Sequence, residues 1–167
     1  MLGAGGLLFC NLYRQDEIIA LDAQTLQPRH RFGLSLLNDT RGKAVAGEEL
    51  FVCDCGNDRL QVFSLAGEHR RSITGEWKRP MALCFVKDRL YLVEGPDPDE
   101  EGFIIYRADA LPGRRIFVLS LQGDTLHVYT HPDEGQHFSS LCCFDGKLLA
   151  VVRDWPRLLS VVALCGV

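Results

Sequence analysis

The feature that most constrains the fold is a series of short apolar runs, separated by polar turns, that recurs along the chain. The clearest example lies within 49–68, where the apolar runs 50–53 and 60–63 are joined by a turn that contains Gly56 and Asn57. Gly and Asn tolerate the positive φ angles of tight hairpin turns. This stretch therefore predicts a β-hairpin.

The ends of the second apolar run in each unit recur at nearly constant spacing. They fall at Asn11, Asp54, Glu94 and Asp154, which gives intervals of 43, 40 and 60 residues. An interruption of about 18 residues (96–113) in the third unit accounts for the longer interval. A period of about 40 to 45 residues with four strands per unit is typical of β-propeller blades. The sequence predicts an all-β fold, a propeller segment of about four antiparallel blades.

The predicted blades divide a single domain, 1–167, into four units. The first unit shows no innermost strand, and the fourth unit shows no strand after its third strand. We therefore expect two complete and two partial four-stranded blades. An open ring exposes unpaired backbone groups and apolar blade faces. We therefore expect either a longer propeller that contains these blades or a second copy that completes the ring. The units span about 1–33, 43–75, 80–131 (with a loop insertion at 96–113) and 137–167.

The second unit resembles an NHL-type β-propeller repeat, most strongly over 44–95. An NHL repeat has an apolar strand, an Asp, a Gly-Asn-x-Arg turn and a strand that ends in Phe. The stretch 78–83 is similar to the entry of an NHL blade, with Ala82 where Gly is usual. The remaining units share only the strand pattern. The residues that carry the resemblance are Asp54, Gly56, Asn57, Arg59, Val62 and Phe63.

The resemblance implies a non-catalytic scaffold module that binds a protein partner. NHL-like propellers commonly bind through the face formed by the loops between second and third strands and by the loops between blades. We expect a binding role for the basic and aromatic residues that this scheme gathers there. They are Arg59, Lys78, Arg79, Phe103, Tyr106, Arg153, Trp155 and Arg157.

Some residues of this face also have a structural interpretation. Asp and Asn stabilise turns by bonding nearby backbone, and Arg59 is placed to pair with Asp54 across the hairpin. We therefore expect Asp54, Gly56, Asn57 and Arg59 to form a structural turn that fastens neighbouring blades. Trp155 lies between two Arg residues, a pattern found at recognition surfaces, but its ring could instead pack beneath its own loop.

The sequence gives little support for catalysis. It contains no Gly-x-Ser-x-Gly motif, phosphate-binding loop or metal-spaced His pair, so we expect no enzyme, no cofactor and no metal. The resemblance implies one alternative, because some six-bladed relatives are calcium-dependent lactonases or esterases. In that case Asn11, Asp54, Glu94 and Asp154 would form the carboxylate ring. The acidic run 97–101 could also hold a hard cation.

Composition bears on the partner and the compartment. The formal net charge of −4 disfavours nucleic acid, and single-stranded RNA binding is a second alternative. The seven Cys lie mostly in apolar runs, so we expect reduced thiols and a cytoplasmic or other reducing intracellular compartment. No stretch approaches the roughly 20 apolar residues that span a membrane, and we expect no membrane partner. We expect His131 and His137 to be exposed on a loop between blades.

Overall fold

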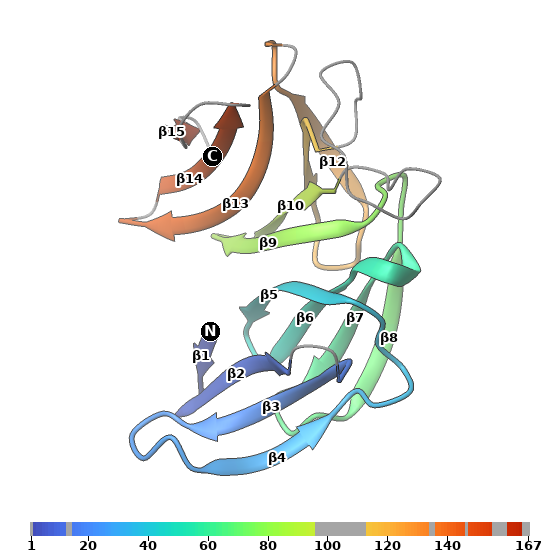
Figure 1. Ribbon diagram of the computed structural model, residues 1–167, viewed down its shortest axis with the longest axis vertical. Helices are drawn as coiled ribbons and strands as arrows, with labels where there is room; N and C mark the ends of the chain where they lie inside the picture. The colour runs from blue at the N-terminus through green and yellow to red at the C-terminus, as the bar shows by residue number, and fades with distance from the viewer. Residues whose placement is uncertain are drawn as a thin grey trace.

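The computed structural model describes residues 2–12, 15–95, 113–133, 136–145, 147–154 and 160–164. These residues form fifteen β-strands and one short 3-10 helix, η1 (Cys55–Asn57). The strands make four antiparallel sheets (Figure 1), which confirms the predicted all-β fold. No helix within the described residues is long and apolar enough to cross a membrane.

Each sheet is built from consecutive strands, and we number the sheets as blades 1 to 4 in chain order. Blade 1 contains β1 (Leu2–Ala4), β2 (Leu7–Leu12), β3 (Glu17–Asp22) and β4 (Pro28–Phe32). Blade 2 contains β5 (Thr40–Ala46), β6 (Glu49–Asp54), β7 (Arg59–Ser64) and β8 (His69–Thr74). Blade 3 contains β9 (Pro80–Val86), β10 (Arg89–Glu94), β11 (Arg115–Leu119) and β12 (Thr125–Thr130). Blade 4 contains β13 (Gln136–Phe144), β14 (Lys147–Asp154) and β15 (Ser160–Leu164).

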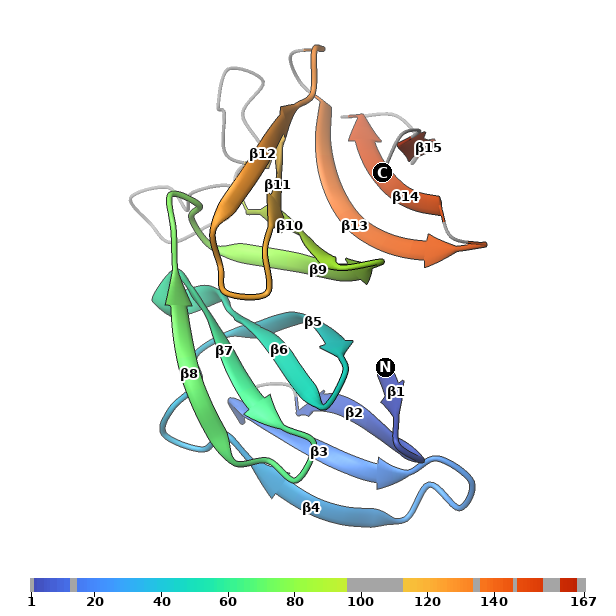
Figure 2. The same ribbon diagram turned by 180° about the vertical axis from the view of Figure 1, so that it is seen from behind.

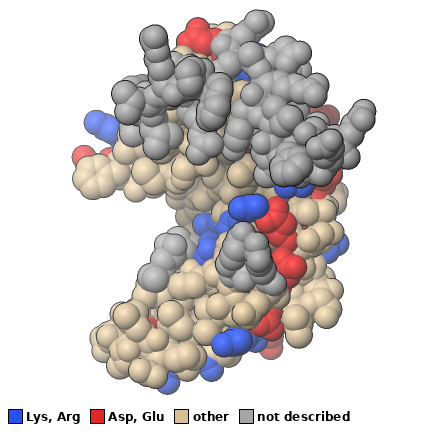
Figure 3. Space-filling view, in the orientation of Figure 1, with Lys and Arg blue, Asp and Glu red and all other residues tan. Residues whose placement is uncertain are grey.

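The blades are arranged in an arc around a common axis (Figures 1 and 2), and the space-filling view shows a hollow beside that axis (Figure 3). The first strand of each blade contacts the first strand of the next: β1 contacts β5, β5 contacts β9, and β9 contacts β13. The last strands β4, β8 and β12 lie on the outer rim. This is the arrangement of a β-propeller. The hollow is open on the side between blades 1 and 4 (Figure 3).

Apolar clusters between adjacent blades form the core. Successive residues of a strand face opposite sides of its sheet, so a strand in a middle blade buries side chains against both neighbours. This explains why 50–53 is a continuous apolar run instead of an alternating one. The clusters contain Phe9, Ile18, Leu50 and Phe63 between blades 1 and 2; Phe51, Leu60, Trp77 and Phe117 between blades 2 and 3; and Tyr91, Ile116, Leu141 and Leu148 between blades 3 and 4.

Blade 1 has an innermost strand that the sequence pattern did not reveal. β1 pairs antiparallel with β2, and Leu2 lies opposite Phe9 in the register. The expectation of a missing strand in the first unit was therefore wrong. The strand is only three residues long, which is too short for a pattern of apolar alternation. It is followed by a turn at Gly5 and Gly6, both at positive φ. Blade 4 has three strands in the part of the chain that the structure describes, as expected.

The packing of blade 2 on blade 3 gives a prediction about stability. Leu60 is completely buried in the cluster between them. Leu60→Ala should therefore lower the free energy of unfolding by about 2–5 kcal/mol, because it leaves a cavity in a close-packed site. Urea denaturation measures the change. The matched control Leu126→Ala, at a residue 52% exposed on β12, should change it by less than about 0.5 kcal/mol. Similar losses for both variants would contradict the packed interface between blades.

Candidate functional site

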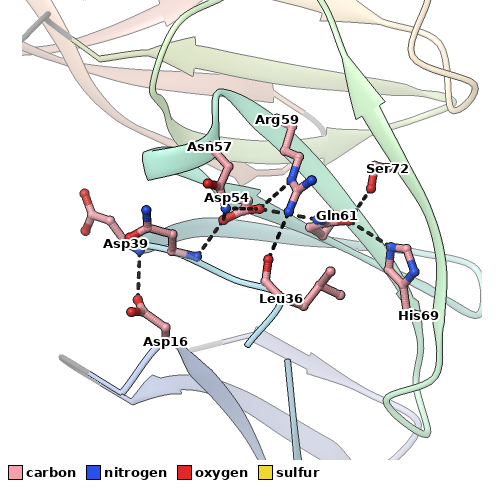
Figure 4. Close-up of polar contacts among 10 residues, drawn as sticks. Asp16, Leu36, Asp39, Asp54, Asn57, Arg59, Gln61, His69 and Ser72 are labelled. Carbon is pink, nitrogen blue, oxygen red and sulfur yellow. Dashed lines mark hydrogen bonds and ion pairs between the residues drawn. The ribbon is translucent and has the colours of Figure 1, made fainter. Parts of the chain in front are cut away.

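Asp54, at the end of β6, is the centre of a buried polar network (Figure 4). Arg59 Nε donates to its Oδ2 at 2.7 Å, across the hairpin from β6 to β7. Asn57 Nδ2 donates to both carboxylate oxygens at 3.0 Å. The backbone N–H of Asn38 donates to Oδ1 at 2.7 Å. Because Asn38 lies in the loop that enters blade 2, the carboxylate fixes this loop as well as its own hairpin.

Two further bonds tie the same loop to the hairpin turn. Arg59 Nη2 donates to the carbonyl oxygen of Leu36 at 3.0 Å. The backbone N–H of Gly56 donates to the carbonyl oxygen of Asn38, also at 3.0 Å. A Cβ at position 56 would lie 2.6 Å from the Asn38 side chain, which is closer than real Cβ contacts come. A side chain at position 56 would therefore displace the Asn38 side chain, so the close approach of the two loops favours Gly, at a φ that is not positive.

Blade 3 repeats this arrangement with different residues. Glu94 is completely buried at the end of β10, and Arg115, at the start of β11, donates to it at 2.5 and 2.6 Å. This hydrogen bond raises the pKa of Arg115 above its usual value. The N–H of Lys78, in the loop that enters blade 3, donates to Glu94 at 3.5 Å. Sequence reasoning missed the pair because the insertion separates its members, although Glu94 occupies the repeat position of Asp54.

The loops between blades are joined to each other on the same face. Asp58 accepts the backbone N–H of Arg79 at 2.7 Å and pairs with Lys78 Nζ at 3.2 Å. Arg79 Nη2 lies 3.3 Å from Asp39, whose own N–H donates to Asp16 at 2.8 Å (Figure 4). These contacts connect blades 1, 2 and 3. We call the face formed by 33–39, 55–59 and 75–79 the loop face.

A cavity of about 590 Å³ borders the loop face, where residues of blades 1, 2 and 3 meet. Its lining is mostly polar, and the carboxylates in it bond other groups of the network. The lining residues are Asn11, Leu12, Asp16, Asn38, Asp39, Thr40, Arg41 and Met81.

The structure places three of the expected binding residues on the loop face. Arg59 and Arg79 have side chains that are 29% and 20% exposed and are held by carboxylates, whereas Lys78 is 58% exposed. Lys78 is thus the most accessible of the three to a partner. The other expected binding residues and the acidic run 97–101 lie outside the described residues, except that Arg153 is described as part of the β14 backbone. They are Phe103, Tyr106, Trp155 and Arg157.

Three of the four strand ends that could form a carboxylate ring have other partners, and the side chain of the fourth, Asp154, lies outside the described residues. Asp54 and Glu94 bond Arg side chains, and Asn11 donates to the carbonyl oxygens of Thr40 and Arg41. Among the described residues, no group of three or more His, Cys, Asp or Glu side chains is placed to hold a metal ion.

Two thiols and one imidazole are buried. Cys53 and Cys55 are buried, and burial raises both thiol pKa values, that of Cys55 to about 11. His137 is only 2% exposed because it lies in β13, so the expectation of an exposed loop residue was wrong for it. His131 is intermediate in exposure.

Comparisons with known proteins identify the fold. No model of a known family matches the chain, and no curated protein matches it in sequence. The structure resembles hydrazine synthase from Kuenenia stuttgartiensis with a TM-score of 0.69 and 14% identity, over 96% of this chain and 43% of that chain. It also resembles the WD40 domain of Neurospora crassa Pan2, with a TM-score of 0.62 and 11% identity, over 89% of this chain and 41% of that chain.

A third similar structure has a chain of comparable length. The computationally designed Ika4 protein matches with a TM-score of 0.61 and 13% identity, over 97% of this chain and 88% of that chain. By contrast, the chain spans less than half of the hydrazine synthase and Pan2 chains. At these identities the likeness identifies the fold as a β-propeller and nothing more specific.

The Asp54 network gives a second prediction. Arg59→Met should lower the free energy of unfolding by about 3 kcal/mol, because it leaves a fully buried carboxylate without its cation. The control Arg29→Met removes an exposed ion pair with Asp22 and should cost at most about 1 kcal/mol. Chemical denaturation of both variants measures the difference. Equal stability of the two variants would show that the buried pair does not support the fold.

Proposed function

We propose that this chain is a non-catalytic protein-interaction module of the NHL-like β-propeller type, which binds its partner through the loop face. The observation that carries the proposal is the Asp54 network. The residues of the NHL-like turn, Asp54, Gly56, Asn57 and Arg59, all take part in it. They hold the loop that enters blade 2 against the hairpin turn of that blade, as a binding surface on a rigid scaffold requires.

The chemistry of the loop face supports binding over catalysis. The two buried carboxylates at strand ends, those of Asp54 and Glu94, are each bonded to an Arg side chain. A carboxylate held in this way serves as a fastener and is not free to act as a general base. Lys78 and the rim of the adjacent cavity remain accessible to a partner. The six described Cys are free thiols, which supports a cytoplasmic or other reducing compartment.

Charge reversal at Lys78 tests the binding face. Lys78→Glu should abolish capture of the specific protein partner, because it places an acidic group where the partner meets a cation, beside Asp58. The control Lys87→Glu makes the same change in the turn from β9 to β10, at the opposite ends of the blade strands. Affinity capture with quantitative mass spectrometry, followed by binding of the purified partner, compares the variants. If Lys78→Glu retains the partner as well as Lys87→Glu does, the loop face is the wrong surface.

We further propose that a second copy of the chain completes the ring. The face of blade 1 that points away from blade 2 carries Leu8, Leu12 and Leu21, because Phe9, Ile18 and Ala20 occupy the side toward blade 2. The free face of blade 4 also carries apolar residues. They are Cys142, Phe144, Leu149 and Val151, which alternate with the residues packed on blade 3.

These two end faces are of opposite kinds. The free face of blade 4 is the side that would pack on a following blade, as blade 1 packs on blade 2. The free face of blade 1 is the side that would pack on a preceding blade, as blade 4 packs on blade 3. Two copies related by a two-fold axis would therefore make two equivalent contacts and leave no open blade face. Such a dimer would be a closed ring of eight blades.

Light scattering on a sizing column tests this proposal. The purified chain should have twice its mass of 18.7 kDa. Leu21→Glu should convert the dimer to monomer, because it places a charge on the free face of blade 1 without entering the core. The control Leu126→Glu, on the exposed surface of β12, should remain dimeric. A monomeric wild-type chain, or a Leu21→Glu variant that is still a dimer, would exclude this assembly.

A further inference from the structure

The inner wall of the hollow contains a second cavity, of about 510 Å³, formed by β5, β9 and β13. Its charged lining residues are Arg41 and Lys43, and no carboxylate lines it. The chain as a whole has a formal net charge of −4. Lys and Arg side chains are visible deep in the hollow (Figure 3). The cavity is therefore cationic in an otherwise acidic protein.

Lys43 carries a charge that no described carboxylate balances. Its Nζ donates to Asn11 Oδ1 at 2.9 Å. The amide nitrogen of Asn11 donates to the carbonyl oxygens of Thr40 and Arg41, at 3.1 and 2.6 Å, which fixes its oxygen toward Lys43. Within the described part of the chain, Lys43 forms no ion pair, and burial lowers its pKa. A partly desolvated ammonium with a neutral partner is a favourable place for an anion.

Two guanidinium groups near the cavity pair with the same carboxylate. Arg41 pairs with Asp39 at 2.8 Å, but Asp39 also lies 3.3 Å from Arg79. One carboxylate is thus shared by two guanidinium groups. Asp16 lines the adjacent cavity on the loop face and accepts the N–H of Asp39.

Part of the wall is suited to the apolar portion of a ligand. Val45, Met81 and Phe85 line the cavity and are partly exposed. Cavities of this size, mostly apolar with a few fixed polar groups, are typical of small-molecule sites. β5, β9 and β13 are also edge strands of their sheets, so their backbone groups border the hollow.

We propose that this cavity binds a small organic monoanion, a carboxylate with an apolar chain. Its charge lies against Lys43 Nζ, and its apolar chain lies on Met81 and Phe85. The site adjoins the cavity on the loop face, with which it shares Arg41 and Met81. It gives this propeller a ligand site on its central wall.

Titration of the full-length chain by ¹H–¹⁵N NMR tests the proposal with hexanoate, hexan-1-ol and inorganic phosphate. Hexanoate should give saturable shifts of amides in β5 and β9, with an affinity at least about tenfold above that of hexan-1-ol, which is a difference of about 1.4 kcal/mol. Phosphate, which lacks the apolar chain, should also bind at least about tenfold more weakly. If hexan-1-ol binds with the same affinity as hexanoate, the proposed role of the charge is wrong. If phosphate binds with the same affinity as hexanoate, the proposed role of the apolar wall is wrong.

Lys43→Gln tests the residue directly. Glutamine can still donate to Asn11 but carries no charge, so hexanoate should bind about tenfold more weakly while hexan-1-ol binding is unchanged. Lys87→Gln, in the exposed turn between β9 and β10, should bind hexanoate as the wild type does. Unchanged hexanoate affinity in Lys43→Gln would overturn the proposal. If that variant does not fold, the three titrations of the wild-type chain are sufficient to test the proposal.

Discussion

The bond between a buried carboxylate and the backbone of the preceding loop is the constraint on which the blade geometry depends. Asp54 has no exposed surface, so its desolvation must be offset by direct partners. It finds them in Arg59, Asn57 and the N–H of Asn38. Because the last of these belongs to the loop that enters the blade, one carboxylate sets both the hairpin and the position of the neighbouring connection.

The same constraint explains how blade 3 accommodates a long insertion. Glu94 and Arg115 make the bond that Asp54 and Arg59 make in blade 2, although the chain between them is far longer. The Cα partners Val93 and Ile116 continue the ladder directly beside the pair. A clamp at the base of the insertion keeps the strands in register, and the length of the loop beyond it costs little, since closure entropy grows only slowly with length.

The two proposed sites use different parts of the propeller. The loop face is built from connections that the carboxylates hold, and it presents side chains such as Lys78 outward. The central wall is built from the first strands of the blades, which are sheet edges. Lys43 lies there because β5 must pass close to Asn11 of blade 1, and the small side chains around it leave room for a ligand.

The sequence by itself determined the strands and their grouping, because the apolar run 50–53 and the turn with Gly56 and Asn57 are local signals. It also indicated the pair of Asp54 with Arg59, which are five positions apart. It did not reveal β1, whose three residues have no pattern, or the pair of Glu94 with Arg115. Contacts between distant segments, such as Lys43 with Asn11, were decided only by tertiary structure, because they depend on how blades pack and leave no spacing in the sequence.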